Sequence, residues 1–270
     1  MNEIAKKIAA AGLAFVMAAG GIGCVPSGRA EAALDRFEAD DTSEAILADA
    51  TLPYLWLIND EYTLSAGYVP ENLLEVSSGI RLAEKAADAW YALLRGMKLD
   101  GVEPVFEYRT GYVPYEEREK QVEETTAYYL EQGYSRVRAE KFAVYDCGRP
   151  GADPFQTGML LAIETDASGE TASWLRENAA EYGFLLTEEE NGFTLRLVGE
   201  WHALAMQTLG TDLEGYLAYL DQCGSYSVLS AGHLYRVELL NDLSLSSGAV
   251  LAVCGDNRGN FIVITRTQGE

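Results

Sequence analysis

The spacing of apolar residues predicts a chain of mixed helices and strands. Ser78–Met97 places apolar residues three or four positions apart, the period of a helix with one buried side. Val105–Tyr108 is a short apolar and aromatic run that predicts a strand ending at Arg109. The following segments predict two helices, a strand, a helix, a hairpin and two more helices, in this order: Tyr115–Gln132, Ser135–Val144, Met159–Glu164, Thr171–Tyr182, residues 184–198, Glu200–Leu209 and Leu213–Leu220. We therefore expect an α+β fold, in which helices pack around a small antiparallel sheet.

The chain changes character after Leu220. Residues 226–267 are rich in Val, Leu, Ser and Gly and predict a short β appendage of about three strands. Gly255–Gly259 has the glycine, Asn and Asp content of a turn, so these residues have a structural explanation. We assign no ligand to the appendage.

Composition and charge limit the classes of function. The chain has 270 residues, of which 48% are hydrophobic and 10% aromatic, enough to form a buried core. Its net charge of -22 argues against nucleic acid as a partner, because phosphates require a basic surface. The same charge argues against electrostatic docking on anionic lipids or wall polymers. A solvated acidic surface suits an exported protein that must stay soluble.

The N-terminus predicts export. A basic Lys6-Lys7 pair precedes an uncharged stretch, residues 8–28, whose apolar core is short for a membrane span. Two cleavage sites stay open: cleavage before Cys24 would leave a lipidated cysteine, whereas Ala30–Ala32 suits simple secretion. We favour Cys24 because it ends the apolar core. The protein is then expected on the outer face of a bacterial cytoplasmic membrane, held only by its N-terminal lipid, or else secreted.

The remaining cysteines do not indicate a metal site. Cys147, Cys223 and Cys254 lack the close spacing of thiolate metal ligands. In an exported protein one disulfide is possible, and Cys223–Cys254 is the candidate pair. Cys147 has no histidine nearby in sequence to activate it, so we expect a buried, inert thiol.

Several short motifs follow one another in the order of a known family. They are Tyr68–Leu74, Tyr108–Thr110, Gly148–Ile163, Trp174–Phe184 and Leu195–Gly199. With these motifs the chain resembles the VanY-type D-alanyl-D-alanine carboxypeptidases over most of its length. The resemblance implies a VanY-like zinc peptidase core. It divides the chain into an export segment, an acidic Ala-rich tether, a carboxypeptidase-like core and a small β extension, at residues 1–24, 25–50, 51–222 and 223–270.

The resemblance also implies where zinc ligands should stand. The family holds zinc with a His and an Asp in the middle motif and a second His further along, next to a Glu that acts as the general base. The corresponding positions here are Phe155, Ala162, Thr194 and, for the base, Asn191. A catalytic zinc needs three protein ligands, and Phe and Ala have no lone pair to donate. We therefore expect the peptidase fold without zinc, without another cofactor and without catalytic residues.

A second alignment of the last motif stays open. It takes Glu200–His202 as the remnant of the base and ligand, and it would need a deletion directly afterwards. We favour the first alignment because Asn191 and Gly192 lie between two apolar runs and predict a tight type I′ hairpin turn. The family has a longer loop at this point. Even under the second alignment, one histidine alone would not make a zinc site.

Part of the substrate cleft remains in the sequence. By resemblance it comprises Arg109, Tyr108, Thr110, Asp153 and Gln156. In the family the corresponding Arg lies near the substrate carboxylate, a role that suits its planar fork of donors. Alternatively, Arg109 pairs with a local acid such as Glu107 or Glu116.

These observations leave more than one class of function. The first is a catalytically inactive VanY-like exported protein that binds peptidoglycan stem peptides or a wall-enzyme partner. The alternative is an active D-Ala-D-Ala metallocarboxypeptidase whose ligands lie elsewhere in the sequence. A structural lipoprotein without a small ligand is a third class. The fold cannot separate them, because function depends on the site.

Overall fold

The computed structural model describes residues 51–230, 233–241 and 249–266. They belong to two compact units, one formed by residues 57–204 and the other by the described residues from 205 onward together with residues 51–56. The expected export segment, the tether and Cys24 lie outside the described residues. No helix within those residues is long and apolar enough to cross a lipid bilayer.

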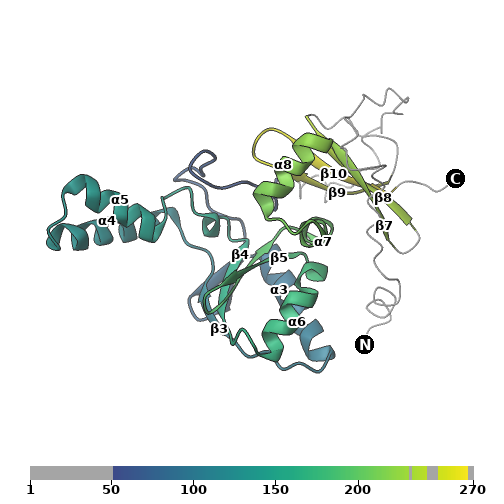
Figure 1. The fold of residues 1–270 in the computed structure, drawn as a ribbon, viewed down its shortest axis with the longest axis horizontal. Coiled ribbons are helices and arrows are strands. Elements are labelled where there is room, and N and C mark those ends of the chain that lie inside the picture. Colours follow the sequence, from purple (N-terminus) through teal and green to yellow (C-terminus); the bar gives the residue numbers. More distant parts are fainter. Residues whose placement is uncertain (1–50, 231–232, 242–248, 267–270) are drawn as a thin grey trace. The chain divides into compact units, whose positions relative to one another are not determined.

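The larger unit is built on an antiparallel sheet of four strands (Figure 1). Their order in the sheet is β3, β4, β6 and β5, at Glu107–Thr110, Leu160–Glu164, Gly192–Leu197 and Phe184–Glu189. The two central strands, β4 and β6, are mostly buried along their length, whereas the outer strands β3 and β5 are more exposed. The expected α+β fold, with helices around a small antiparallel sheet, is confirmed.

Two helices cover the core-facing side of this sheet. They are α3 and α6, at Glu84–Leu99 and Glu170–Asn178. The fully buried Trp90 of α3 meets Phe184 of β5 edge to face, with ring centroids 6.5 Å apart. From α6, the guanidinium of Arg176 lies 5.2 Å above the ring of Phe193. The core of this unit therefore lies between β5, β6 and the two helices.

The predicted start of the first helix is wrong. Instead of a helix from Ser78, the chain forms a hairpin of β1 (Leu73–Ser77) and β2 (Ile80–Ala83), and α3 begins only at Glu84. Gly79 adopts a φ of 75° in the turn, a conformation that glycine tolerates well. Leu82 is buried in both arrangements, so its spacing alone could not distinguish a helix from a strand.

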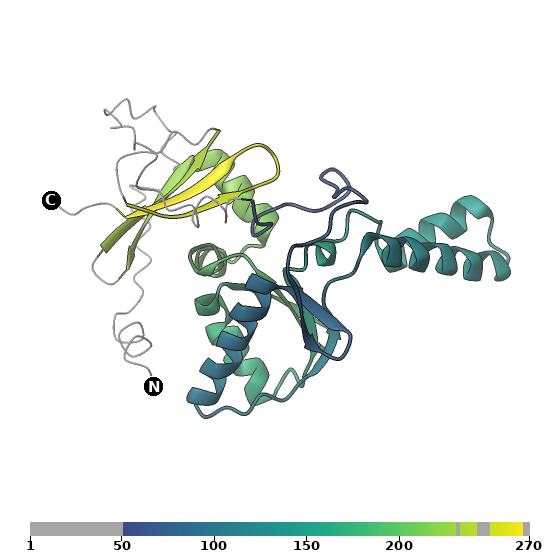
Figure 2. The same cartoon turned by 180° about the vertical axis from the view of Figure 1, so that it is seen from behind.

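The helices α4 (Tyr115–Glu131) and α5 (Arg136–Cys147) form a hairpin that extends away from the sheet (Figures 1 and 2). No residue of α4 is buried, which agrees with its high content of charged side chains. A short 3-10 helix, η2 (Pro154–Thr157), connects α5 to β4. A second one, η3 (Ala179–Tyr182), follows α6, so the helix predicted over residues 171–182 is divided in two.

The hairpin predicted over residues 184–198 is confirmed, but its turn differs from the prediction. Glu189 pairs with Gly192, so the two loop residues are Glu190 and Asn191 rather than Asn191 and Gly192. Asn191 has no positive φ, which excludes a type I′ turn centred on it. Gly192 begins β6, where a Cβ would lie only 2.0 Å from the Ile163 carbonyl oxygen of β4. Close contact between the strands therefore explains the glycine.

The second unit contains the predicted β appendage. The helix α7 (Glu200–Leu209) leads into this part of the chain, and α8 (Leu213–Cys223) follows. The sheet has four antiparallel strands rather than about three, in the order β7, β8, β10, β9, at Ser225–Ser230, His233–Leu240, Phe261–Arg266 and Ala249–Gly255. Val253 and Val263, fully buried on neighbouring strands, form its apolar centre.

The turn between β9 and β10 is organised by one buried carboxylate. Asp256 is completely buried and accepts hydrogen bonds from the backbone N–H groups of Arg258 at 2.9 Å and Asn260 at 3.0 Å. The Arg258 guanidinium also donates to Asp221 of α8 at 2.7 Å. The structural explanation for the polar residues of this turn is confirmed.

The candidate disulfide between Cys223 and Cys254 does not form in the structure. Cys223 of α8 and Cys254 of β9 are both buried thiols. Cys147 of α5 is half-buried, and its Sγ lies 3.1 Å from the hydroxyl oxygen of Thr125. Its place between the two helices of the hairpin agrees with a structural thiol.

Candidate functional site

Two of the three positions expected for zinc ligands meet on the side of the sheet opposite α3 and α6. Ala162 of β4 is directly paired with Thr194 of β6, and on its other side with Thr110 of β3. Directly paired residues of an antiparallel sheet have side chains on the same face. All three are half-buried. The Thr194 hydroxyl donates to Glu189 of β5 at 3.0 Å. A methyl group and two hydroxyls thus form the centre of this face.

Phe155, the remaining expected ligand position, lies in η2. Its side chain is half-buried, and its backbone N–H donates to the Asp153 carboxylate at 3.0 Å. Asp153 in this way caps the start of η2. The residue type is decisive here, because a phenyl ring has no donor atom for a metal.

The residues present do not fit the zinc of a VanY-type peptidase. A catalytic zinc needs three ligands drawn from His, Cys, Asp and Glu, plus an open position. Within residues 51–230, 233–241 and 249–266, no group of three such side chains could hold a metal ion. We therefore derive no reaction step through a metal at this site.

Two expected cleft residues are engaged by their surroundings. Asp153 is 8% exposed, and Arg118 of α4 donates to its carboxylate through Nε at 2.9 Å and also through Nη2. Gln156 is 1% exposed and donates through Nε2 to the Ser65 carbonyl oxygen at 3.4 Å. Sequence reasoning missed Arg118, because it lies in a helix full of charged residues that gives no sign of its partner. Both cleft residues therefore support the local fold.

Arg109 lies at an irregularity of β3 and forms ion pairs with two acids. Its Nη2 contacts the Glu164 carboxylate of β4 and lies 3.7 Å from that of Glu107. This corresponds to the alternative in which Arg109 pairs with a local acid such as Glu107. Because the Arg109 side chain is 51% exposed, these pairs contribute at most about 1 kcal/mol each. A ligand carboxylate could compete with them.

An acidic concave region lies next to Arg109. It has a volume of about 700 Å³, and its carboxylates belong to Glu107, Glu164, Asp166 and Glu190. Asn191, the expected base position, lines the same region with an amide group. Negative walls weaken the binding of an anionic ligand, so a carboxylate would reach Arg109 against a repulsive local field.

Tyr108 belongs to a different surface from Arg109. Its hydroxyl accepts a hydrogen bond from Trp90 Nε1 at 3.0 Å, and its ring lies 6.2 Å from Trp90, on the α3 side of the sheet. Burial raises the pKa of the Tyr108 hydroxyl above its usual value. The structure thus brings Thr110 beside Ala162, places Arg109 against acids, and separates Tyr108 from both.

His202 does not join a second donor cluster. It lies on α7, is 2% exposed, and burial lowers its pKa to about 3. The imidazole is therefore neutral at physiological pH. No metal-binding group of three donors includes it among the described residues. The other histidine, His233, is part of β8 in the second unit.

A buried arginine on the side of the sheet opposite α3 and α6 was not expected. Arg196 of β6 is 9% exposed and pairs in register with Leu160, two positions from Thr194. Burial lowers the pKa of its guanidinium to about 10, so it stays charged at neutral pH. The motif Leu195–Gly199 had drawn attention to this strand, but only the sheet shows which face Arg196 occupies.

The comparisons with known proteins agree with the resemblance. No family model matches the chain. A D-alanyl-D-alanine carboxypeptidase of Enterococcus faecalis is 28% identical over 135 residues, which are 48% of this chain and 49% of that protein. A putative carboxypeptidase of Bacillus subtilis, YodJ, is 26% identical over 212 residues, which are 68% of this chain and 71% of that protein. The match thus spans about half the length of the first relative.

A solved structure supports the fold. The vancomycin resistance D,D-dipeptidase VanXYg, in complex with a D-Ala-D-Ala phosphinate analogue, superimposes with a TM-score of 0.61 and 15% identity. The alignment covers 82% of this chain and 96% of that one. This chain is therefore an α+β protein with the fold of these peptidases. Its sequence is similar to those of D-alanyl-D-alanine carboxypeptidases.

Proposed function

We propose that the protein is a catalytically inactive, VanY-like relative of the D-alanyl-D-alanine carboxypeptidases that binds peptide ends of peptidoglycan. One observation carries the inactivity: Ala162 and Thr194 are side by side on the face of the sheet opposite α3 and α6, where the resemblance implies two zinc ligands. With Phe155 at the third position, the donor set of a catalytic zinc is missing.

The missing groups are those that make a nucleophile from water. Hydrolysis at neutral pH needs a metal-bound water of lowered pKa or a positioned general base. Asn191 presents an amide, which cannot take up a proton in this range, and Thr194 presents a hydroxyl bonded to Glu189. These side chains can form hydrogen bonds to a peptide but cannot activate water.

Peptide binding is assigned to the surface around Arg109. Its guanidinium is half exposed, and a bidentate contact with a terminal carboxylate needs only the fork of donors. Glu164 and Glu107 compete for the same donors, and the neighbouring acidic walls repel the ligand. We therefore expect weak binding, with a Kd of about 1 mM or more.

Metal content and activity test the inactivity. Purified full-length protein should contain far less than one zinc per chain by elemental analysis, and a chelator should leave its Tm unchanged. Peptides ending in D-Ala-D-Ala should release no D-alanine. One tightly bound zinc per chain, or D-alanine release that Glu200→Ala or His202→Ala abolishes, would refute the proposal and support the active alternative.

An NMR titration tests the binding site separately. A D-Ala-D-Ala peptide should shift the amide resonances of Arg109 and Thr110, and Arg109→Ala should remove these shifts. Arg138→Ala serves as the matched control, because Arg138 is an exposed arginine on the distant α5. Shifts that persist in Arg109→Ala would place the ligand elsewhere. An absence of shifts would leave a wall-enzyme partner as the remaining role for this surface.

The proposed location follows from residues outside the described part of the chain. We propose that Cys24 is lipidated and that residues 25–50 tether a carboxypeptidase-like core, residues 51–222, and a β extension, residues 223–270, to the outer face of the bacterial cytoplasmic membrane. Metabolic labelling with a palmitate analogue should mark the wild type and not Cys24→Ala. Release of both forms into the medium, with cleavage after Ala32, would support secretion instead.

A further inference from the structure

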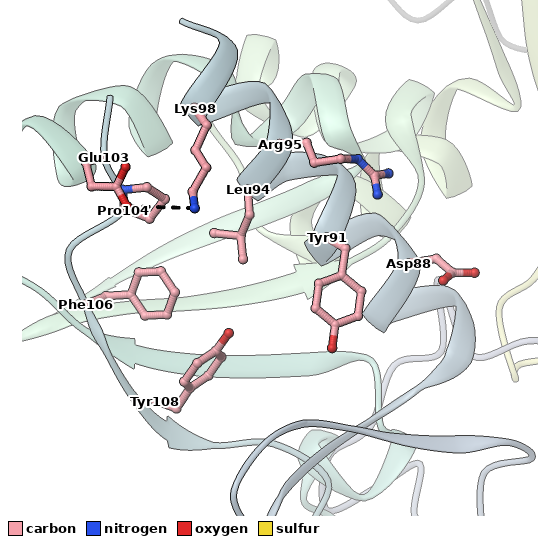
Figure 3. A pocket seen from close by; sticks show the side chains of 9 residues that line it. All are labelled: Asp88, Tyr91, Leu94, Arg95, Lys98, Glu103, Pro104, Phe106 and Tyr108. Carbon is pink, nitrogen blue, oxygen red and sulfur yellow. Dashed lines mark ion pairs between the residues drawn. The ribbon is translucent and has the colours of Figure 1, made fainter. Parts of the chain in front are cut away.

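A groove on the opposite side of β3 is not used by the proposed function. It lies between α3 and residues 103–108, has a volume of about 590 Å³, and is shown in Figure 3. Leu94, Phe106 and Tyr108 form a half-buried apolar floor, while Tyr91 and Arg95 stand exposed on the α3 side. A preformed apolar depression with a few polar groups on its rim is the usual form of a binding site.

The floor of the groove is held in place from below. The fully buried Trp90 contacts the ring of Phe106 at 5.3 Å and donates a hydrogen bond to the Tyr108 hydroxyl at 3.0 Å. Phe106 and Tyr108 meet edge to face, with centroids 5.0 Å apart and planes at 85°. Crossed rings make a depression for a side chain rather than a flat platform on which a sugar would stack.

The other wall is the free edge of the sheet. Among the residues that the structure describes, β3 is the outermost strand of this sheet and pairs with β4 alone. Just before it, the N–H of Val105 donates to Thr171 Oγ1 at 3.0 Å, and its carbonyl accepts from Thr165 Oγ1 at 2.7 Å. Both groups therefore point inward. Backbone groups alternate in direction along an extended strand, so those of Phe106 point outward, where a further strand could pair.

This edge can pair only over a short length. Pro104 has no N–H to donate, and the irregularity at Arg109 interrupts the strand on the other side. The free stretch is thus centred on Phe106. A bound peptide would form few backbone hydrogen bonds and would depend on its side chains for affinity and specificity.

Four charged side chains line the groove: two acids, Asp88 and Glu103, and two bases, Arg95 and Lys98. Lys98 is paired with Glu103 at 3.7 Å, as Figure 3 shows. Arg95 makes no ion pair within the part of the chain that the structure describes, although the protein carries a net charge of -22. An open guanidinium above an apolar floor complements a carboxylate close to an apolar side chain.

We propose that this groove binds an extended peptide segment of a partner protein, with an apolar side chain on Phe106 and Tyr108 and a carboxylate on Arg95. The Tyr108 side of the site lies on the opposite face of β3 from Arg109, because successive residues of a strand point to opposite faces, whereas Phe106 lines both this groove and the acidic region next to Arg109. The groove gives the protein a second, metal-independent mode of peptide recognition, in which the sheet edge is extended by one short strand.

Binding can be measured with a defined probe and two variants. The probe is the acetylated, amidated peptide Thr-Val-Phe-Thr-Asp, added to full-length 15N-labelled protein. We expect amide shifts at Phe106 and Tyr91. Arg95→Gln should weaken binding about three- to five-fold, the effect of one exposed ion pair. Arg138→Gln is the matched control and should leave the Kd unchanged. Tyr91→Ala should weaken binding to the same or a greater extent.

Two altered probes separate the contributions. A peptide with Asn in place of Asp should bind the wild type about three- to five-fold more weakly and should not discriminate between wild type and Arg95→Gln. A peptide N-methylated at its central residue should lose binding, because it lacks the backbone N–H that pairs with the strand edge at Phe106. Equal binding of the Asp and Asn peptides would overturn the proposal. So would the absence of shifts at Phe106, or binding of triacetylchitotriose in the groove without binding of the peptide.

Discussion

Lowering the pH should destabilise the larger unit through His202. This side chain is 2% exposed on α7, and burial lowers its pKa from 6.5 to about 3. In the unfolded chain the imidazole takes up a proton near its ordinary pKa. Between these two values the unfolded state therefore binds more protons than the folded state. The stabilising contribution is fully present above pH 6.5 and is lost as the pH falls towards 3.

The linkage relation gives the size of the effect. With pKa values of about 6.5 unfolded and about 3 folded, the free energy of unfolding should fall by about 2 kcal/mol between pH 7.5 and pH 5.0. Other groups act in the opposite sense. Partial desolvation raises the pKa of Glu181 and Glu200, so their contribution becomes more favourable as the pH decreases. The contribution of His202 to the pH dependence must therefore be measured by comparing the wild type with a variant that lacks the imidazole.

Urea unfolding of the wild type and His202→Asn at pH 7.5, 6.5 and 5.0 makes this comparison. The variant removes the titrating group, so its free energy of unfolding should fall by about 2 kcal/mol less over this range. Only the difference in pH dependence is interpreted, because the variant also loses packing. Parallel pH profiles would refute the reasoning. They would show that the imidazole is accessible in the folded state, as a ligand in the second alignment would need to be.

Three further changes should destabilise the fold, each measured by urea unfolding monitored by circular dichroism. Gly192→Ala would place a methyl group 2.0 Å from a carbonyl oxygen of β4 and should cost about 3 kcal/mol; a cost under about 1 kcal/mol would contradict the close strand contact. Asp256→Ala removes the acceptor of two backbone N–H groups and one partner of Arg258, and should cost about 3 kcal/mol in the second unit, whereas unchanged stability would exclude its role in the turn. Arg118→Met leaves the buried carboxylate of Asp153 without its cation and should cost about 2 kcal/mol; no loss would mean that water replaces the pair.

Local sequence patterns are enough to predict most of the helices and strands. The predicted and observed bounds of α7 are the same, Glu200–Leu209, and α4 differs by one residue at its end. Both segments lack glycine and proline, and α4 is rich in charged residues of high helix propensity, so the local sequence favours a helix. The helix predicted over Ile80–Ala83 was wrong, because the position of Leu82 fits both the apolar stripe of a helix and one face of a strand. Its pairing with Leu74 across the Gly79 turn decided the outcome.

In the candidate site, too, some features follow from the sequence alone and others only from long-range contacts. The absence of donors at Phe155 and Ala162 was evident from the sequence, because the ability to bind a metal belongs to the residue type in any fold. The partners of Arg109 and Asp153 were not evident. Glu164 is 55 residues from Arg109, and Arg118 is 35 residues from Asp153. An ion pair at such a separation depends on which strands and helices become neighbours, which only the tertiary structure decides.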